Sequence, residues 1–294
     1  MSNLFKYTLL AITVVALSME SNAQVQNVLD GAYYNDRTYL RVTNMTKRVI
    51  PYPHLREADV MYVKRIWQEM DLKQKINHPY YFPIDPINDR SNLFDVIREA
   101  LLFDGALLAF STGAIGDEDE FTNRNVLSLD SIRTILNPVK RVNKYDDYTG
   151  DIIGFDEIIT PISSDLITRY RLKEDWIWDR QRSERYVRII GIAPMIEKFD
   201  RDGESIGYSP LFWLYYPSCR YVFAHADVFN LYNDAQRRTY EDLFQKRYFS
   251  SYIVKEGNVY DRSIIEFAYG MDALAESERI KEELFNLEHD LWHY

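Results

Sequence analysis

Cysteine is almost absent from this sequence: Cys219 is the only one among 294 residues, so no internal disulfide can form. Glycine is scarce as well, with 11 residues, which leaves little material for loops that cradle phosphate groups. The sequence contains no P-loop, no G-x-G-x-x-G and no G-x-S-x-G motif, and no Ser or Cys stands beside a His in a recognisable nucleophile motif. These absences argue against the common enzyme classes.

An excess of positive charge is also missing. Lys and Arg total 35 against 45 Asp and Glu, so the formal net charge is 35 − 45 = −10. A nucleic-acid-binding protein should carry a basic excess that neutralises phosphates. With 46% hydrophobic and 27% charged residues, the chain is neither disordered, collagen-like nor a disulfide scaffold. The 23 tyrosines are a surplus, and because Tyr is large and amphipathic they indicate contact surfaces as well as core.

The first 23 residues have the pattern of a secretory signal peptide. Lys6 precedes an apolar stretch at 9–17, and the small residues of Ser21-Asn22-Ala23 follow as a cleavage site. The apolar stretch is too short for a membrane-spanning helix, which needs about 20 residues. No Cys lies near the site, so acylation of the first mature residue is not expected. We expect cleavage after Ala23, export to the periplasm and no membrane span.

The exported chain is expected to have two parts. Residues 24–50 lack a clear hydrophobic period and are expected to form an extended N-terminal arm. Residues 51–294 are expected to form a globular region, which can be subdivided near 145–150.

Helical spacing dominates the start of the globular region. Residues from about 54 to 77 are expected to form a helix, which His78-Pro79 ends. Its apolar face carries Val60, Val63, Trp67 and Met70. The opposite face carries most of the basic residues: Lys64, Arg65, Lys73 and Lys75. Further helices are expected after Ser91 as N-cap and over 128–136.

The middle of the chain changes character to strands. Four segments rich in Ile, Val and aromatic residues are bounded by turn residues: 151–160, 167–172, 185–199 and 206–216. A hairpin is expected about Asp202-Gly203. Helices then return at 227–249 and, most clearly, at 272–292. This order predicts an α+β fold, with an antiparallel sheet of about four strands and flanking N- and C-terminal helices.

The last predicted helix carries a narrow apolar stripe that steps by four, three and four residues: Ile280, Leu284, Leu287 and Leu291. This stripe is expected to pack either against a partner or against the protein's own core. Charge is unevenly spread, with a net of +4 over 33–78 and −6 over 265–294. These two regions are either ordinary solvated faces or the two sides of a head-to-tail contact between copies. Together with Lys64, Arg65, Lys73 and Lys75, the stripe forms the candidate interaction surface.

No residue pattern predicts a catalytic, cofactor or metal site. His289 and His293 are four residues apart on the last helix, but no third ligand is evident and the Glu of a zincin motif is missing from between them. The carboxylates at 117–120 are expected to form a solvated loop. Cys219 is expected to be a small buried residue near a strand end, with an intermolecular disulfide or a reactive thiol as the alternatives.

Several long and unusual segments occur in the order typical of one known family. They are 47–52 (KRVIPY), 55–60 (LREADV), 64–67 (KRIW), 77–83 (NHPYYFP), 173–176 (KEDW), 188–192 (RIIGI), 211–213 (LFW), 249–252 (FSSY) and 258–262 (NVYDR). In these segments the chain resembles the gliding motility protein GldN family, called PorN in non-gliding relatives. The resemblance covers roughly residues 44–292.

The resemblance implies a structural role in a protein complex and no catalytic activity. It implies a component of the type IX protein secretion and gliding motility system of Bacteroidetes, in the periplasm at the inner face of the outer membrane. It also implies a ring complex of several copies with a GldK/PorK-type lipoprotein, which meets the periplasmic region of the inner-membrane motor complex. No catalytic residues or cofactors come with it.

Two other functions stay open at this point. One is a periplasmic hydrolase or metal-binding enzyme, which would need His289 and His293 or the Cys219 thiol in a cleft. The other is a periplasmic ligand-binding adaptor, which would need a preformed concave pocket lined with aromatic residues.

Overall fold

The computed structural model describes residues 47–290 apart from 88–89, 114–117, 146–151, 201–202, 231–232 and 234, and it does not describe the side chains of 140–145 and 152–158. The predicted signal peptide, most of the predicted arm, Leu291 and His293 therefore lie outside the described residues.

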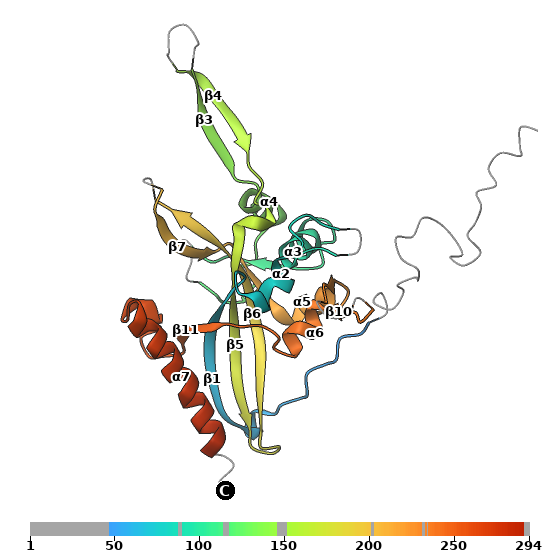
Figure 1. The fold of residues 1–294 in the computed structure, drawn as a ribbon, viewed down its shortest axis with the longest axis vertical. Coiled ribbons are helices and arrows are strands. Elements are labelled where there is room, and N and C mark those ends of the chain that lie inside the picture. The colour runs from blue at the N-terminus through green and yellow to red at the C-terminus, as the bar shows by residue number, and fades with distance from the viewer. Residues whose placement is uncertain are drawn as a thin grey trace, which may run out of the picture. The chain divides into compact units, whose positions relative to one another are not determined.

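An antiparallel sheet of seven strands organises the described chain (Figure 1). Its order is β11-β1-β5-β6-β8-β2, and β7 pairs with β6 beside this path. The strands are β1 (Val60–Asp71), β2 (Ala109–Phe110), β5 (Ile167–Asp179), β6 (Glu184–Phe199), β7 (Ser205–Pro210), β8 (Trp213–Tyr215) and β11 (Tyr252–Glu256). The α+β prediction is confirmed, but the sheet has more strands than the four expected.

The helices precede, interrupt and follow these strands. They are α2 (His78–Tyr81), α3 (Leu93–Leu102), α4 (Leu129–Leu136), α5 (Tyr216–Phe223), α6 (Tyr240–Gln245) and α7 (Met271–Asp290). Short 3-10 turns are η2 (Glu57–Asp59), η3 (Lys75–Asn77), η4 (Ser164–Leu166) and η5 (Ile264–Glu266). Two further ladders are β3 (Val139–Tyr145) with β4 (Ile152–Ile159), and β9 (Asp227–Val228) with β10 (Arg238–Thr239). The predicted helices near 92, at 128–136 and at 272–292 are confirmed, with Asn92 in place of Ser91 as the N-cap of α3.

The helix predicted over 54–77 is wrong, because most of this segment forms the strand β1. β1 lies between β5 and β11, so both of its edges are hydrogen-bonded. Residues 66–70 are buried without interruption, because both faces of the strand are covered there. A strand buried on both faces shows no alternation, and its apolar residues can then match a helical period by chance.

The helix predicted over 227–249 is also mostly wrong. Only α6 is helical in this segment, and it follows the short β9–β10 ladder. The Thr239 side chain accepts the Asp242 N–H, while the Asp242 carboxylate accepts the Thr239 N–H at 3.1 Å, which forms a capping box. This reciprocal pair starts the helix at Tyr240 and satisfies two backbone donors.

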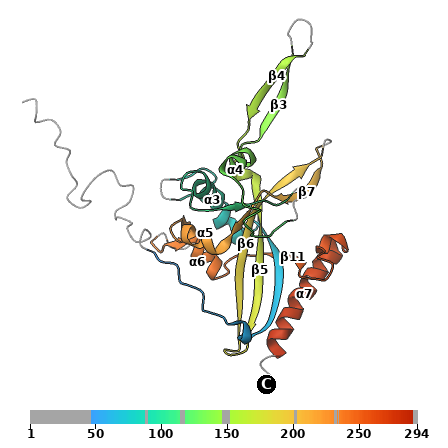
Figure 2. The ribbon, with the colours of Figure 1, turned by 180° about the vertical axis from the view of Figure 1, so that it is seen from behind.

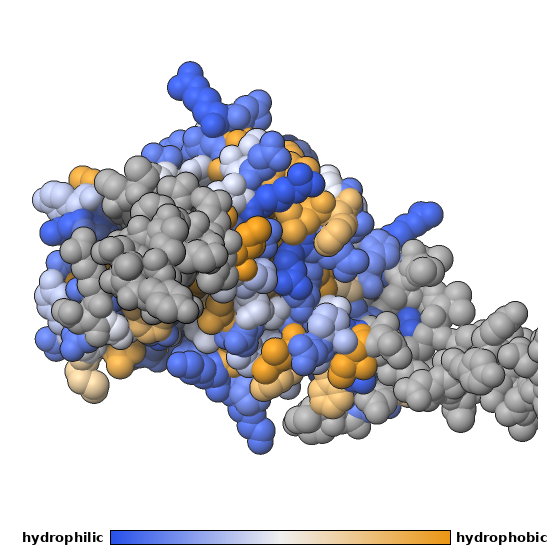
Figure 3. Space-filling model, turned by 90° about the horizontal axis from the view of Figure 1, so that it is seen from above, coloured by the Kyte–Doolittle hydropathy of each residue, from blue (hydrophilic) through white to orange (hydrophobic). Residues whose placement is uncertain are grey.

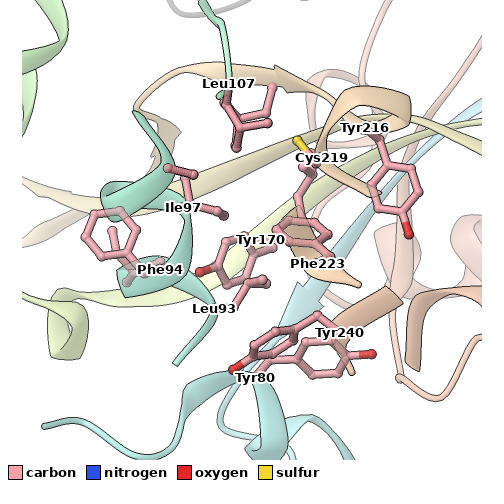
Figure 4. Packing of buried hydrophobic residues seen from close by; sticks show 14 of the residues in the cluster. Tyr80, Leu93, Phe94, Ile97, Leu107, Tyr170, Tyr216, Cys219, Phe223 and Tyr240 are labelled. Atoms are coloured by element: carbon pink, nitrogen blue, oxygen red, sulfur yellow. The ribbon is translucent and has the colours of Figure 1, made fainter. Parts of the chain in front are cut away.

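One face of the sheet carries the main core. Tyr170 and Leu172 of β5 pack there with Ile192 of β6 against residues of α2 to α6. Figure 4 shows the Tyr170 ring in this cluster among side chains of α2, α3, α5 and α6. The rings of Tyr80, Tyr216 and Tyr240 are buried in this core, and the Tyr240 hydroxyl donates to the Ser91 carbonyl at 2.8 Å. Part of the tyrosine surplus is therefore core.

The same face carries a smaller cluster below α7. Ile66 of β1 and Trp178 of β5 meet Ile280 and Leu284 of α7 there. Side chains alternate between the faces of a strand, so Tyr62, Lys64 and Ile66 belong to the face that α7 covers. Figures 1 and 2 both show α7 beside β1 and β11.

The opposite face of the sheet is covered by a loop instead of helices. Trp67, Trp213 and Val254 form a cluster there, and Phe121 of the loop packs against it. Gly191 makes this approach possible, because a Cβ at this position would lie 2.6 Å from Cζ of Phe121. The Phe121 ring over Gly191 is thus one of the contacts that hold the loop on the sheet.

Candidate interaction surfaces

Lys64 and Arg65 do not share a face. As neighbours on β1 they point to opposite sides of the sheet. Lys64 forms ion pairs with Glu256 of β11 at 2.6 Å and with Glu283 of α7 at 3.8 Å. Arg65 donates two hydrogen bonds to Asp175 of β5, at 2.7 and 2.9 Å. Both cations therefore form ion pairs with carboxylates of their own chain. Through Glu283, Lys64 connects the basic N-terminal region to the acidic helix α7.

Lys73 and Lys75 lie elsewhere, in the exposed turn between β1 and α2. No ion pair to a described carboxylate is recorded for either side chain. Of the four predicted basic residues, Lys73 and Lys75 are therefore the two that can bind a partner in the described structure.

The apolar stripe of α7 faces the sheet. Ile280 and Leu284 are buried in the cluster with Ile66 and Trp178, and Leu287 packs against its edge. Leu291 lies outside the described residues. The structure thus supports the core alternative for the three described members of the stripe.

An apolar groove of about 490 Å³ lies beside Lys75. Its walls are mostly apolar and its described lining includes no carboxylate: Lys75, His78, Pro79, Phe82, Pro83, Ile87, Arg90 and Phe229. The Phe82, Ile87 and Phe229 side chains stay 45%, 53% and 42% exposed. The Arg90 guanidinium lies 5.2 Å from the centre of the Phe229 ring, a cation–π contact at the rim.

The sequence prediction missed this groove, although the aromatic connector at 80–83 is the signal that could have indicated it. Figure 3 shows one face of the molecule, where hydrophobic residues reach the described surface in several groups between hydrophilic ones. Phe229 comes from a segment about 150 residues later in the chain, so only the fold brings the groove together.

A second hollow, of about 550 Å³, lies over the loop-covered face of the sheet. Aromatic and charged side chains share its lining: Trp67, Tyr208, Trp213, Arg171, Lys198, Lys255, Asp119, Asp261 and Glu266. Most of these cations have partners, since Arg171 pairs with Glu69 at 2.6 Å and Lys255 with Asp261 at 2.7 Å. The hollow is therefore concave and partly aromatic, but its charges are largely neutralised internally.

Lys173 and Asp119 form a buried contact at the edge of this second hollow. The Lys173 ammonium lies 3.0 Å from the Asp119 carboxylate, which also accepts a hydrogen bond from the Trp67 indole at 2.5 Å. The acidic loop at 117–120 is expected from the sequence to be solvated. Its Asp119 instead contacts Lys173 and Trp67 on the sheet.

Glu69 is a carboxylate with three partners on the same, loop-covered face. It accepts hydrogen bonds from Arg171 at 2.6 Å and from the Tyr252 hydroxyl at 2.7 Å, and Arg169 lies 3.4 Å away. Burial by itself raises the pKa of this carboxyl, but the charge and hydrogen bonds of Arg171, with Tyr252 and Arg169, outweigh burial and hold its pKa below the ordinary value. Glu69 is thus a structural anion held by its neighbours.

Glu174 is fully buried on the opposite face of the sheet. Arg247 donates two hydrogen bonds to it at 2.8 and 3.1 Å, and the Trp176 indole donates a third at 3.0 Å. Arg247 has a positive φ of 52° at the end of α6, where glycine is the usual residue. From this backbone conformation the Arg247 side chain reaches Glu174.

The chemical candidates from the sequence are the His289/His293 pair and the Cys219 thiol. No group of three or more His, Cys, Asp or Glu side chains within them is placed to hold a metal ion. Cys219 is buried in α5, where burial raises the pKa of its thiol, so the prediction of a small buried residue is confirmed. His293 lies outside the described residues, so the predicted His pair is not tested.

No described helix is long and apolar enough to cross a bilayer. No curated protein matches the chain. The family described as "Gliding motility associated protein GldN" matches residues 55–293, which is most of the chain.

Proposed function

Since this chain belongs to the GldN family of gliding motility proteins, we propose that it is a non-enzymatic ring component of the type IX secretion machinery. The match over 55–293 is the observation that carries this proposal, because it includes every strand of the sheet and all helices from α2 to α7. It establishes a component of the gliding motility machinery, and the ring, the partners and the location are the proposed part.

The described surfaces support an assembly role. The chain exposes an apolar groove beside Lys75 and near Lys73, and neither lysine has a recorded ion pair within the described residues. The described residues show no metal cluster, and the Cys219 thiol is buried. Exposed apolar patches on folded proteins mark sites where a protein, membrane or ligand binds. The proposed partners are other copies of this chain, a GldK/PorK-type lipoprotein and the periplasmic region of the inner-membrane motor complex.

The location follows from the proposed signal peptide. Cleavage after Ala23 would deliver the chain to the periplasm, where a lipoprotein partner would hold it at the inner face of the outer membrane. Mass spectrometry of the protein from cells should then find Gln24 as its first residue. A chain that keeps residues 1–23 and stays in the cytoplasm would contradict this location.

Purification from cell envelopes tests the ring. The protein should co-purify with a lipoprotein and form particles of many copies, measured by mass photometry and electron microscopy. A protein that stays strictly monomeric, alone and with that lipoprotein, would show that the proposal is wrong.

A second candidate function is a ligand-binding adaptor, which the 550 Å³ hollow favours because its lining is partly aromatic. Lys198 and Ile206 line this hollow, and no ion pair to a described carboxylate is recorded for Lys198. If the hollow binds a partner segment, Lys198→Glu and Ile206→Ser should abolish co-purification of that partner and leave self-association intact. Unchanged co-purification in both variants would exclude this use of the hollow.

A further inference from the structure

The solvent-facing side of α7 carries a second apolar stripe, distinct from the stripe that packs on the sheet. Leu274 and Phe285 are eleven residues apart, about three helical turns of 3.6 residues, so they lie on the same side of the helix. Met271 lies one turn before Leu274 on that side. These three side chains are 79% (Met271), 57% (Leu274) and 64% (Phe285) exposed.

Acidic residues accompany this outer stripe. Glu278 and Glu282 lie on the same side of α7 and are exposed. Glu278 has only a long contact of 3.5 Å with Lys281, and no ion pair to a described cation is recorded for Glu282. Lys281 also lies on this side, between Leu274 and Phe285, and its side chain is exposed. With Glu278 and Glu282 it gives 1 − 2 = −1, so the outer side of α7 is apolar with a small negative net charge, whereas the groove beside Lys75 is apolar and basic.

The two surfaces cannot meet within one molecule. On the same face of the sheet, α7 lies along β1 and β11 toward one edge, whereas α5 and α6 lie toward the other edge, near α2 and β10 (Figures 1 and 2). The groove belongs to the latter group, because Lys75 lies in η3 directly before α2, His78 opens α2, and Phe229 follows β9, the partner of β10.

We propose that the outer side of α7 of one copy binds in the groove lined by Lys75, Phe82, Ile87 and Phe229 of the next copy. Helices that lay one apolar side into an apolar groove are a recurrent mode of recognition. The contact joins two different surfaces, so each copy uses both and the assembly propagates head to tail until it closes. This inference rests on the proposed ring and names the surfaces that build it.

Opposite charges set the register of the contact. Glu278 and Glu282 of one copy would face Lys75 and Arg90 of the next, with Lys73 at the margin. Charge pairs at such a rim mainly steer association and exclude wrong partners. Of the basic residues predicted as an interaction surface, Lys73 and Lys75 take part in this contact. Lys64 and Arg65 do not.

Cysteine crosslinking in cells tests the contact directly. The double variant Phe285→Cys with Ile87→Cys should form a ladder of disulfide-linked multimers after oxidation, seen by immunoblot. Each single variant should give no ladder, and the native Cys219 is silent because it is buried. The matched control pair is Phe285→Cys with Phe103→Cys, since Phe103 is 83% exposed and lies outside the groove. This pair should also give no ladder.

Charge reversal supplies an independent readout. Lys75→Glu and Glu282→Lys should each reduce the yield of assembled particles by roughly tenfold, and combining them should restore it. Lys246→Glu and Asp104→Lys are matched controls at exposed positions outside both surfaces, and they should leave the yield unchanged.

The outcomes separate this inference from the proposed function. A ladder together with rescue by the double reversal supports the contact. Rings without a ladder, or charge reversals without effect, overturn the contact and leave the ring standing. If the wild-type copies never associate in envelopes, both the contact and the ring are overturned.

Discussion

At the scale of single residues, buried charges decide how the strands and helices are joined. Glu174 is fully buried and is compensated by Arg247, which reaches it from the end of α6. A buried charge that loses its partner costs about 3–5 kcal/mol, whereas the intact pair contributes little net stability. Such pairs fix the placement of α6 more than they stabilise the fold.

Replacing Arg247 should therefore destabilise the protein strongly. Arg247→Met should lower the free energy of unfolding by about 3 kcal/mol, because it leaves the Glu174 carboxylate buried without its cation. Chemical denaturation at pH 7 measures this. Adding Glu174→Gln to Arg247→Met should recover part of the loss, since the buried charge is then removed. A double variant less stable than Arg247→Met would contradict this account.

Glu69 predicts a pH dependence with a defined sign. Its pKa in the folded state is held below the ordinary value of 4.5, so its interactions contribute stability that is present above that pH and is lost as the pH falls through the folded-state value. Arg171→Gln should lower the free energy of unfolding by about 2 kcal/mol at pH 7, less than for a fully unpaired charge because Arg169 and Tyr252 remain.

The difference between wild type and Arg171→Gln should shrink as the pH is lowered below about 4.5, when protonation removes the charge that Arg171 stabilises. Urea unfolding between pH 7 and pH 3 measures it. Arg56→Gln, whose ion pair with Asp59 is exposed, is the control and should show no such trend. A constant difference for Arg171→Gln at every pH would refute this role of Glu69.

At the scale of elements, α7 has two different sides. Leu284 is 2% exposed and packs on the sheet, whereas its neighbour Phe285 is 64% exposed. Only three residues of the 20-residue helix are buried. α7 is thus attached to the sheet by a narrow contact and presents most of its surface outward.

Neighbouring substitutions on α7 should separate folding from assembly. Leu284→Ala should lower the free energy of unfolding by about 2 kcal/mol, because it opens a cavity in the cluster with Ile66 and Trp178. Phe285→Ala should change it by less than about 0.5 kcal/mol, as for exposed positions in general. Thermal unfolding of both purified variants measures this. Equal losses would show that the orientation of α7 is different.

Gly191 leaves the space in which Phe121 of the loop packs on the sheet face away from the helices. Gly191→Ala should destabilise the protein by about 1–3 kcal/mol, because the new methyl group overlaps the Phe121 ring. Adding Phe121→Leu should restore part of this stability by making room. Denaturation of the single and double variants measures the coupling. Additive losses would show that the two residues do not touch.

At the scale of the whole molecule, the segment before β1 is part of the folded unit. Arg220 donates to the Ile50 carbonyl at 2.7 Å and stacks on Tyr52 at 4.0 Å, while Arg188 donates to the Pro53 carbonyl at 2.6 Å. Arg220 is itself buried and paired with Glu241. These contacts tie residues 50–53 to α5, α6 and β6.

Two truncations should therefore differ in stability. A chain beginning at Lys47 keeps these contacts, whereas a chain beginning at Val60 loses them and exposes the Arg220–Glu241 pair to water. The shorter chain should be less stable by about 1–3 kcal/mol, since the buried Arg220 loses the Ile50 carbonyl as an acceptor and the Tyr52 ring beside it. Calorimetry of both chains measures the difference. Equal unfolding temperatures would show that residues 47–59 are not part of the folded unit.

The sequence by itself determined the fold class, the strands β4 to β7, the α4 and α7 helices and the family. These elements carry local signals: Ser128 caps α4, β-branched and aromatic residues fill β5 and β6, and α7 keeps one strict apolar stripe. Such signals act within one element, so they can be read without knowing what the element touches.

Only the tertiary structure decided that residues 60–71 form a strand and which surfaces are exposed for binding a partner. Trp67 and Met70 match a helical spacing, but β5 and β11 supply the hydrogen bonds that make their segment a strand. The same fold neutralises Lys64 and Arg65 with distant carboxylates and turns Leu284 inward, while it leaves Lys75 beside a groove completed by Phe229. Contacts between residues far apart in the chain fix these outcomes, and no local pattern contains them.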